Sequence, residues 1–185
     1  MRPSRLALVV PLAGLAWSAW QAHSRDVSES EERVFRAFNE APDGLAPFLW
    51  PIMQMGSLAA VYGVAAQQYR SEGRDQAIAL AATGTAVWAG VKLIKPVVGR
   101  GRPADHLERV RVRGHSQNGL GYPSGHAAVS LTLALSASLN AGERRLAVLG
   151  AAVTAASRMY VGAHLPLDIV GGVAAGLLIG AMTAS

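Results

Sequence analysis

The sequence lacks cysteine entirely and has few charged residues. With no cysteine among its 185 residues, disulfide bonds and thiolate metal sites are excluded. Only 16% of the residues are charged, 51% are hydrophobic, and the mean hydropathy is +0.25. A soluble domain normally carries about 25% charged residues, so this composition is unusual for a soluble protein. The length corresponds to one domain.

The few charges are unevenly distributed. Residues 92–126 contain seven basic and two acidic residues, a balance of +5, whereas the rest of the chain contains ten of each sign. Such a local excess favours an anionic ligand held at one place. A nucleic-acid-binding stripe is the alternative, but it rarely lies between apolar segments, so we expect no nucleic-acid partner.

Six segments are almost free of charge. They cover residues 6–20, 45–69, 76–96, 124–142, 146–162 and 166–184. A bilayer core requires about 20 predominantly apolar residues per helix, so we predict an all-α fold, a six-transmembrane-helix bundle forming a single domain over residues 1–185. The alanine and glycine content favours close helix packing. A soluble all-helical core is disfavoured because the short connections supply too little polar surface to coat it.

Basic residues in the short loops predict the orientation. They stand near the N-terminus, in the 70–75 loop and in the 143–145 loop: Arg2, Arg5, Arg70, Arg74, Arg144 and Arg145. With six spans these loops share one side with the C-terminus, and the positive-inside tendency makes that side cytoplasmic. The first segment also resembles a signal peptide, but it lacks a clean small-x-small cleavage site, which favours an uncleaved span. Short, alanine-rich spans fit a bacterial inner membrane.

The opposite side holds residues 21–44, residues 95–123 and the turn around 158–165. Ser28-x-x-Glu31 has the pattern of a capping box and predicts an amphipathic interfacial helix over about 28–40, ending at Pro42-Asp43-Gly44. The basic excess of residues 95–123 runs against the positive-inside pattern. Anion binding would explain it.

Three groups of polar residues lie beside the spans on this same side. They are Lys95 and Arg102 after the third span, Ser124, Gly125 and His126 at the start of the fourth, and Arg158, His164 and Asp168 between the fifth and sixth. Taken singly, each has a structural explanation as an interfacial anchor or a helix cap. Ionisable residues at membrane depth are nevertheless costly, and three groups at one face indicate a functional site.

These residue types suit a phosphate. Lys95, Arg102 and Arg158 are donors without acceptor atoms. Ser124 adds a hydroxyl group, and Gly125 offers its N–H at a helix N-terminus, where anions bind. The site is therefore expected to bind phosphoryl oxygens.

A histidine and an aspartate complete the chemistry. Asp168 follows His164 by four residues, with Pro166 expected at the first helical position, so the carboxylate can orient the imidazole and leave its other nitrogen free to attack. His126 remains to donate a proton to the leaving group. Zinc bound by these three residues is the rival interpretation, but three nearby cations oppose it, and we expect no metal or other cofactor.

The three groups resemble the signature of the type-2 phosphatidic acid phosphatase superfamily, which includes lipid phosphate phosphatases and, as soluble cousins, vanadium haloperoxidases. Its motifs Lys-x6-Arg-Pro, Pro-Ser-Gly-His and Ser-Arg-x5-His-x3-Asp stand here at residues 95–103, 123–126 and 157–168 without departure. Tyr160 and Gly162 also match positions that the family often fills in this way.

The resemblance implies a metal-independent phosphatase acting on a lipid phosphate or diphosphate in two steps. His164 would form a phosphohistidine, Asp168 would orient it, and His126 would act as general acid and then as base. The phosphoryl oxygens would be held by Lys95, Arg102, Ser124, Gly125 and Arg158.

An outward-facing site in the membrane suggests a polyprenyl carrier lipid, phosphatidate or phosphatidylglycerophosphate as substrate, with the first favoured. The alternative from another class is a lipid- or anion-binding or transport protein that uses the same cradle without turnover. The pair of His164 and Asp168 disfavours it, since binding alone needs neither residue. A peroxidase is more remote, because those relatives are soluble and larger.

Overall fold

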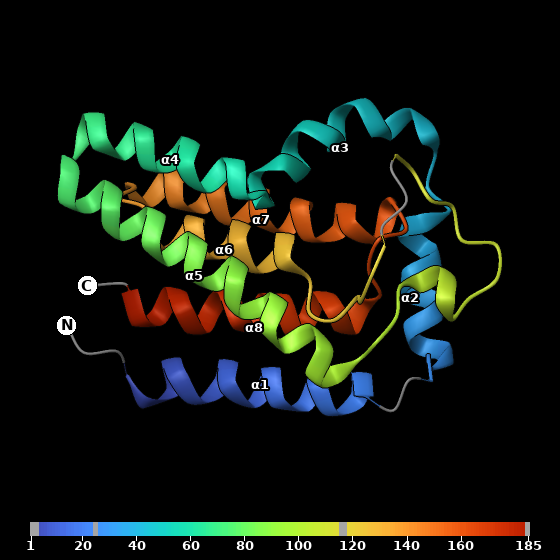
Figure 1. Cartoon of the computed structure of the whole chain (residues 1–185). Coiled ribbons are helices and arrows are strands. Elements are labelled where there is room, and N and C mark those ends of the chain that lie inside the picture. The colour runs from blue at the N-terminus through green and yellow to red at the C-terminus, as the bar shows by residue number, and fades with distance from the viewer. Residues whose placement is uncertain (1–3, 24–25, 115–117, 184–185) are drawn as a thin grey trace.

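The computed structural model describes residues 4–23, 26–114 and 118–183. These residues form helices and loops and no strand, as the predicted all-α class requires (Figure 1). The helices are α1 (Arg5–His23), α2 (Glu29–Asn39), α3 (Ala46–Met53), α4 (Leu58–Ser71), α5 (Arg74–Val98), α6 (Gly125–Ser136), α7 (Ala141–Tyr160) and α8 (Pro166–Thr183). Three short 3-10 turns accompany them: η1 (Asp43–Leu45), η2 (Gln54–Gly56) and η3 (Pro103–Asp105).

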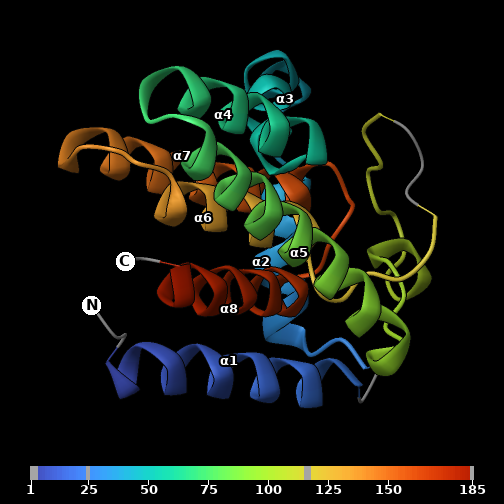
Figure 2. The ribbon, with the colours of Figure 1, turned by 60° about the vertical axis from the view of Figure 1, so that its left-hand side comes forward.

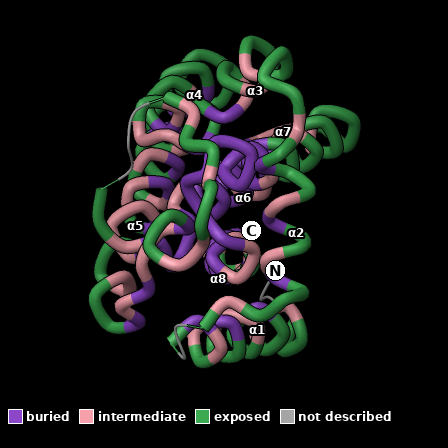
Figure 3. The backbone as a smooth tube through the Cα atoms, turned by 90° about the vertical axis from the view of Figure 1, so that its right-hand side faces the viewer, coloured by how far each residue is buried: buried purple, intermediate pink, exposed green. Residues whose placement is uncertain are grey.

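Helix α6 forms the centre of the bundle. It packs against α5, α7 and α8, and every residue from Ala127 to Ala134 is buried (Figure 3). Helices α4 and α5 pair with each other, and α1 runs along α8 at the edge of the bundle (Figures 1 and 2). Because α6 begins at Gly125, the central helix places its N-terminus at the predicted site.

Glycines on one face of α8 allow it to approach α6 closely. A Cβ atom on Gly172 would fall on the backbone oxygen of Ser124, and one on Gly176 would lie 2.8 Å from the oxygen of Ala128. One turn further, a Cβ atom on Gly180 would lie 2.6 Å from the Leu135 side chain. This spacing of four residues is the small-residue pattern of closely packed membrane helices, and it confirms the close packing that the composition predicts.

The prediction of six transmembrane helices is confirmed only in part. Within the described residues, two helices are long and apolar enough to span a membrane, α8 and α5 with its continuation to Asp105. The region of α3 and α4 becomes a third if its two bent parts count as one span. The other predicted spans also form helices, but α6 has only 12 residues, and α7 begins at Ala141 and includes three charged residues in its first five. Residue 184, the expected end of the last span, lies outside the described residues.

The segment over residues 45–69, expected as a single span, is broken into two bent parts and counts as one span only if the two are taken together. The chain bends by 70° between η2 and α4. A new helix begins there because Ser57 caps α4, its hydroxyl accepting a hydrogen bond from the Ala60 N–H at 3.2 Å. At the bend, a Cβ atom on Gly56 would lie 2.5 Å from the backbone oxygen of His126. The break therefore brings backbone directly against the predicted catalytic segment.

Helix α2 occupies the predicted range but is capped differently. Ser28 accepts from the Glu31 N–H at 3.2 Å, which is one half of the expected capping box. The Glu31 carboxylate does not return to the cap; it turns inward to Arg100. Glu31, Phe35 and Asn39 are buried on the face that packs on α7 and α8. Placement of α2 in the membrane interface stays a prediction.

The ends of the helices divide into two groups, as the loop pattern predicts. Both termini and the turn between α4 and α5 lie at one end of the bundle, while α2 and the segment between α5 and α6 lie at the other (Figure 1). Arg5, Arg70 and Arg74 thus share one end, whereas Arg2 lies outside the described residues. The opposite end holds the predicted site.

Candidate active site

A cavity of about 240 Å³ lies where α5, α6 and the turn before α8 meet. Six of the eight predicted site residues line it: Lys95, Arg102, Gly125, His126, Arg158 and His164. The other two, Ser124 and Asp168, are fully buried behind its wall. A larger groove of about 940 Å³ at the other end of the bundle contains none of the eight. The structure therefore brings the three sequence motifs to one place.

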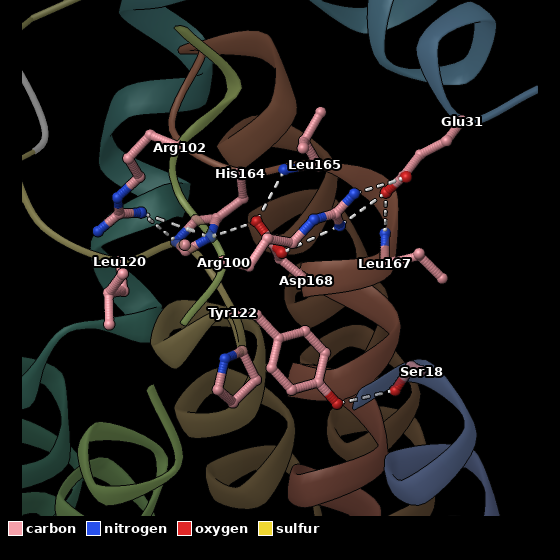
Figure 4. Close-up of polar contacts among 12 residues, drawn as sticks. Ser18, Glu31, Arg100, Arg102, Leu120, Tyr122, His164, Leu165, Leu167 and Asp168 are labelled. Atoms are coloured by element: carbon pink, nitrogen blue, oxygen red, sulfur yellow. Dashed lines mark hydrogen bonds and ion pairs between the residues drawn. The ribbon is translucent and has the colours of Figure 1, made fainter. Parts of the chain in front are cut away.

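His164 is held between a cation and a carboxylate (Figure 4). Its Nδ1 atom lies 3.3 Å from Asp168 Oδ2, and its Nε2 atom lies 3.1 Å from Arg102 Nη1. The same carboxylate oxygen accepts from the Leu165 N–H at 2.9 Å. Asp168 reaches back because α8 begins at Pro166, the first helical position that the sequence predicts.

These contacts determine the tautomer of His164. An ionised carboxylate only accepts, so Nδ1 must donate to Asp168, and Nε2 then carries the lone pair; Arg102 Nη1 lies 3.1 Å from Nε2 and 3.5 Å from Nδ1. Burial, together with the positive charges of Arg102, Arg158 and Lys95, lowers the pKa of the imidazole well below its usual value. The lowered pKa favours the neutral ring, whose Nε2 atom carries the lone pair.

The two arginines that line the cavity, Arg102 and Arg158, have different hydrogen-bond partners. Arg102 Nη1 donates to the Ala163 carbonyl at 2.7 Å, and its Nε donates to the Gly119 carbonyl at 3.2 Å. Arg158 is buried, with Nη1 at 3.0 Å from Met53 Sδ, a weak acceptor. Both guanidinium groups line the cavity and concentrate positive charge there.

Lys95 has more internal partners than the sequence indicates. Its ammonium group donates to the carbonyls of Leu120, Gly121 and Pro123 at 3.0, 2.8 and 3.0 Å. It thus fixes the loop that leads into α6, in addition to lining the cavity. Its charge still acts on an anion there through proximity.

Ser124 and Gly125 lie at the N-terminus of α6, as predicted. Gly125 lines the cavity, where the N–H groups of the first helical turn can meet an anion. Ser124 is 0% exposed, and its hydroxyl has no hydrogen-bond partner among the described residues. Its N–H donates to the Asp168 backbone oxygen at 2.9 Å, which ties α6 to α8.

Arg100 is the functional candidate that the sequence analysis misses. Its side chain is 0% exposed and contacts both Glu31 and Asp168 (Figure 4). It stands between the lysine and arginine of the first motif, where local spacing gives no sign of its partners. Helix α2 supplies the second carboxylate from 69 residues away.

The basic excess of residues 95–123 has several causes and not the single one expected. Arg113 donates to Asp43 at 2.8 Å and stacks over the Tyr160 ring at 4.1 Å, which secures the turn after α7. Arg109 and Arg111 lie outside the lining of the cavity. Of the described residues in this segment, only Lys95 and Arg102 line it. Anion binding therefore accounts for part of the charge, and loop anchoring accounts for another part.

Apolar residues form the side of the cavity between α4 and α5. Leu58, Trp88 and Val91 line it there, and Lys92 lies with its ammonium 3.5 Å from the centre of the Trp88 ring. On the outer face of α5, the side chains of Leu93 and Val97 are about three-quarters exposed. Helix α5 thus carries apolar residues that line the cavity as well as apolar residues that are exposed on the surface.

Comparisons with known proteins agree with this geometry. The family model of the PAP2 superfamily matches residues 76–185, more than half of the chain. No curated protein sequence matches. A transmembrane PAP2-type phosphatidylglycerolphosphate phosphatase from Bacillus subtilis is similar in structure, with a TM-score of 0.76 and 19% identity over 94% of this chain and 92% of that one. LpxE from Aquifex aeolicus has a TM-score of 0.65 and 23% identity over 80% of this chain and 90% of that one. The fold is that of a membrane protein, and the chain belongs to the PAP2 superfamily.

Proposed function

We propose that this protein is a membrane-embedded phosphatase that hydrolyses a lipid phosphate or diphosphate through a phosphohistidine at His164. The observation that carries the proposal is the setting of the His164 ring. Asp168 Oδ2 lies 3.3 Å from Nδ1, Arg102 Nη1 lies closer to Nε2 than to Nδ1, and Arg158 and Lys95 line the same cavity as the ring.

In the first step, Nε2 of His164 attacks phosphorus while the bond to the leaving oxygen breaks. His126, which must be protonated at the start of this step, donates its proton to that oxygen, and the Asp168 carboxylate stabilises the positive charge that the His164 ring acquires. In the second step, His126 takes a proton from water, the oxygen attacks phosphorus, and the P–N bond breaks. Inorganic phosphate leaves, and both histidines return to their starting states. Arg102, Arg158, Lys95, Ser124 and the Gly125 N–H offset the charge on the transferring group.

The size and surroundings of the cavity support a lipid substrate. Pockets that enclose a drug-sized ligand measure about 300–1,000 Å³, so a cavity of about 240 Å³ suits a phosphate head group and leaves the hydrocarbon outside. The Bacillus subtilis neighbour is itself described as acting on a lipid phosphate. Among the candidates we favour a polyprenyl carrier lipid, with phosphatidate and phosphatidylglycerophosphate as the others, and a site on the extracytoplasmic side of a bacterial inner membrane.

The test is to trap the intermediate. Protein incubated with a lipid carrying radiolabelled phosphate and then quenched should retain label, and His164→Ala should lose both the label and turnover. Asp168→Asn keeps the nucleophile but disturbs its tautomer, so we expect kcat to fall by about 10²- to 10⁴-fold.

The same experiment separates catalysis from mere binding. A transport or binding protein with this cradle would bind the lipid and release no phosphate, with equal affinity in wild type and His164→Ala. Full phosphate release by His164→Ala would refute the phosphohistidine mechanism. Loss of activity with a chelator and recovery with zinc would replace it with a metal mechanism.

A further inference from the structure

We propose that Glu31 of α2 and Arg100 are positioning residues, which hold the Asp168 carboxylate and, through it, the His164 ring in the reactive orientation. Neither residue lines the cavity. The kinetic part of this inference rests on the proposed function, whereas its spectroscopic part is independent of it.

The contacts form a continuous row of alternating charge (Figure 4). Arg100 donates two parallel hydrogen bonds to the Glu31 carboxylate, from Nη1 to Oε1 at 2.9 Å and from Nη2 to Oε2 at 2.7 Å. Arg100 Nη1 also reaches Asp168 Oδ1 at 3.4 Å. Asp168 then meets His164 with its other oxygen. A bidentate ion pair of this kind fixes the relative orientation of the two side chains as well as the distance between them.

Asp168 needs this support because it is 0% exposed. An ionised carboxylate without water or a cation is costly to bury, and Arg100 provides the cation. Arg100 is equally buried and needs its own counter-charge, which Glu31 provides. Removing Glu31 leaves the guanidinium free to turn wholly towards Asp168, which would draw the carboxylate away from Nδ1 of His164.

Glu31 also fixes the segment that carries Asp168. Its Oε1 atom accepts from the Leu167 N–H at 2.9 Å, in the first turn of α8. Leu167 precedes Asp168 directly, so one carboxylate sets both the charge beside Asp168 and the backbone from which it extends. Helix α2 therefore contributes to the site without touching the cavity.

If Glu31 and Arg100 only stabilised the fold, replacing them would have a different effect from the one expected of positioning residues. Within the described residues, the hydrogen bonds of the Glu31 and Arg100 side chains go to each other, Asp168 and Leu167. In the described part of the chain none of them goes to Lys95, Arg102 or Arg158. Disturbing the row should therefore slow the chemical step and leave phosphate binding intact.

Glu31→Gln is the variant to test, because it keeps the size of the side chain and one acceptor oxygen. Residues that orient a reacting group typically contribute about 10- to 100-fold, so we expect kcat to fall by that factor, with KM within about 2-fold of wild type. Glu32→Gln is the matched control, since it makes the same change at the next residue, whose partner is the surface residue Arg36 at 2.6 Å. Both constants should stay unchanged in the control. Unchanged kcat in Glu31→Gln, or a loss that only follows the folded fraction, would overturn the inference.

If Glu31→Gln does not fold, the double variant Glu31→Gln with Arg100→Gln replaces it. This variant removes one buried charge of each sign, so the net charge of the row is kept, while Asp168 loses its contact with Arg100. The expected loss in kcat at constant KM is the same. A folded double variant with wild-type kcat would refute the role of the row.

The spectroscopic test follows the His164 ring itself. Nitrogen NMR of histidine-labelled protein, assigned by comparison with His164→Gln, should show hydrogen on Nδ1 in wild type and a mixture of tautomers in Glu31→Gln. An unchanged tautomer means that the inference fails, whether or not the protein is a phosphatase. A changed tautomer in a protein that releases no phosphate from any lipid upholds the inference and refutes the proposed function.

Discussion

Ser124 carries a hydroxyl inside the protein where the described residues offer it no hydrogen-bond partner. A buried polar group without a partner costs stability, so such a group usually serves a purpose. Ser124 precedes Gly125 at the start of α6, beside the cavity. We infer that a phosphoryl oxygen supplies the missing partner when substrate binds.

Replacing Ser124 with alanine should therefore reduce activity without reducing stability. A hydrogen bond to a charged group is worth about 1.5–3 kcal/mol, which corresponds to a loss of roughly 10- to 150-fold in kcat/KM. The midpoint of thermal unfolding should stay the same or rise, because no internal hydrogen bond is lost. Ser130→Ala is the control on the same helix, since the Ser130 hydroxyl donates only to the Ala127 carbonyl at 3.3 Å. Lower stability with normal activity in Ser124→Ala would assign the hydroxyl a structural role.

The sequence predicts the residues that form the site better than it predicts the residues that hold them in place. The eight predicted residues occupy motifs at helix ends, and helix ends on one face of a bundle must meet, so these positions follow from spacing alone. Arg100 does not follow from it, because its partner Glu31 lies 69 residues away and is expected to close a capping box. The three backbone carbonyl groups that accept hydrogen bonds from Lys95 cannot be predicted from the sequence either, because every residue type has the same backbone carbonyl group.

Among the helices, the contact of α8 with α6 is the one that sets the geometry of the site. Asp168 belongs to α8, and Ser124 and Gly125 begin α6. The backbones approach most closely at Gly172, where an added Cβ atom would fall on the oxygen of Ser124. Any side chain at this position has to separate the two helix ends.

Gly172→Ala should therefore impair both stability and turnover. We expect a lower unfolding temperature in detergent and a fall of about 10-fold or more in kcat, because small misplacements of reacting groups are costly. Gly63→Ala is the control, since nothing lies within 4 Å of a Cβ atom added there in α4. It should be neutral or slightly stabilising, because alanine is the better helix former. Equal behaviour of the two variants would show that the close approach is unimportant.

The break in the helix between η2 and α4 cannot be recognised from hydropathy alone. Residues 45–69 contain no charge, so hydropathy treats them as one span. The break depends on Ser57 as a cap and on contact of Gly56 with His126, and the second of these is a tertiary contact. Within this apolar run, Gly56-Ser57 and the prolines Pro47 and Pro51 are the local signs of a break.

For the whole molecule, the site end of the bundle is expected to face away from the cytoplasm. The absence of cysteine allows a direct test with single introduced cysteines. Ser71 and Gly142 are exposed at one end, and Ser30 and Ala104 are exposed at the other. An impermeant thiol reagent added to intact cells should label only Ser30→Cys and Ala104→Cys. Labelling of Ser71→Cys instead would place the site in the cytoplasm.

The whole molecule also determines which phosphates reach the site. In the proposed function the cavity binds the phosphate through cations, a hydroxyl and a helix N-terminus, and none of these groups would recognise what the phosphate is attached to. Selectivity must then come from the apolar wall of Leu58, Trp88 and Val91 and from the lipid beyond α5. One methylene contributes only about 1–3 kcal/mol to discrimination, so lipids that differ slightly should be accepted alike.

We therefore expect a broad preference for long-chain lipid phosphates and diphosphates over soluble esters. Phosphate release in detergent from polyprenyl diphosphate, polyprenyl phosphate, phosphatidate and phosphatidylglycerophosphate should exceed release from glucose-6-phosphate and from a nucleotide, compared as kcat/KM. Trp88→Ala should narrow this difference, because it removes apolar contact with the lipid and leaves the phosphate-binding cations in place. A soluble ester hydrolysed as efficiently as every lipid would mean that selectivity does not come from the membrane.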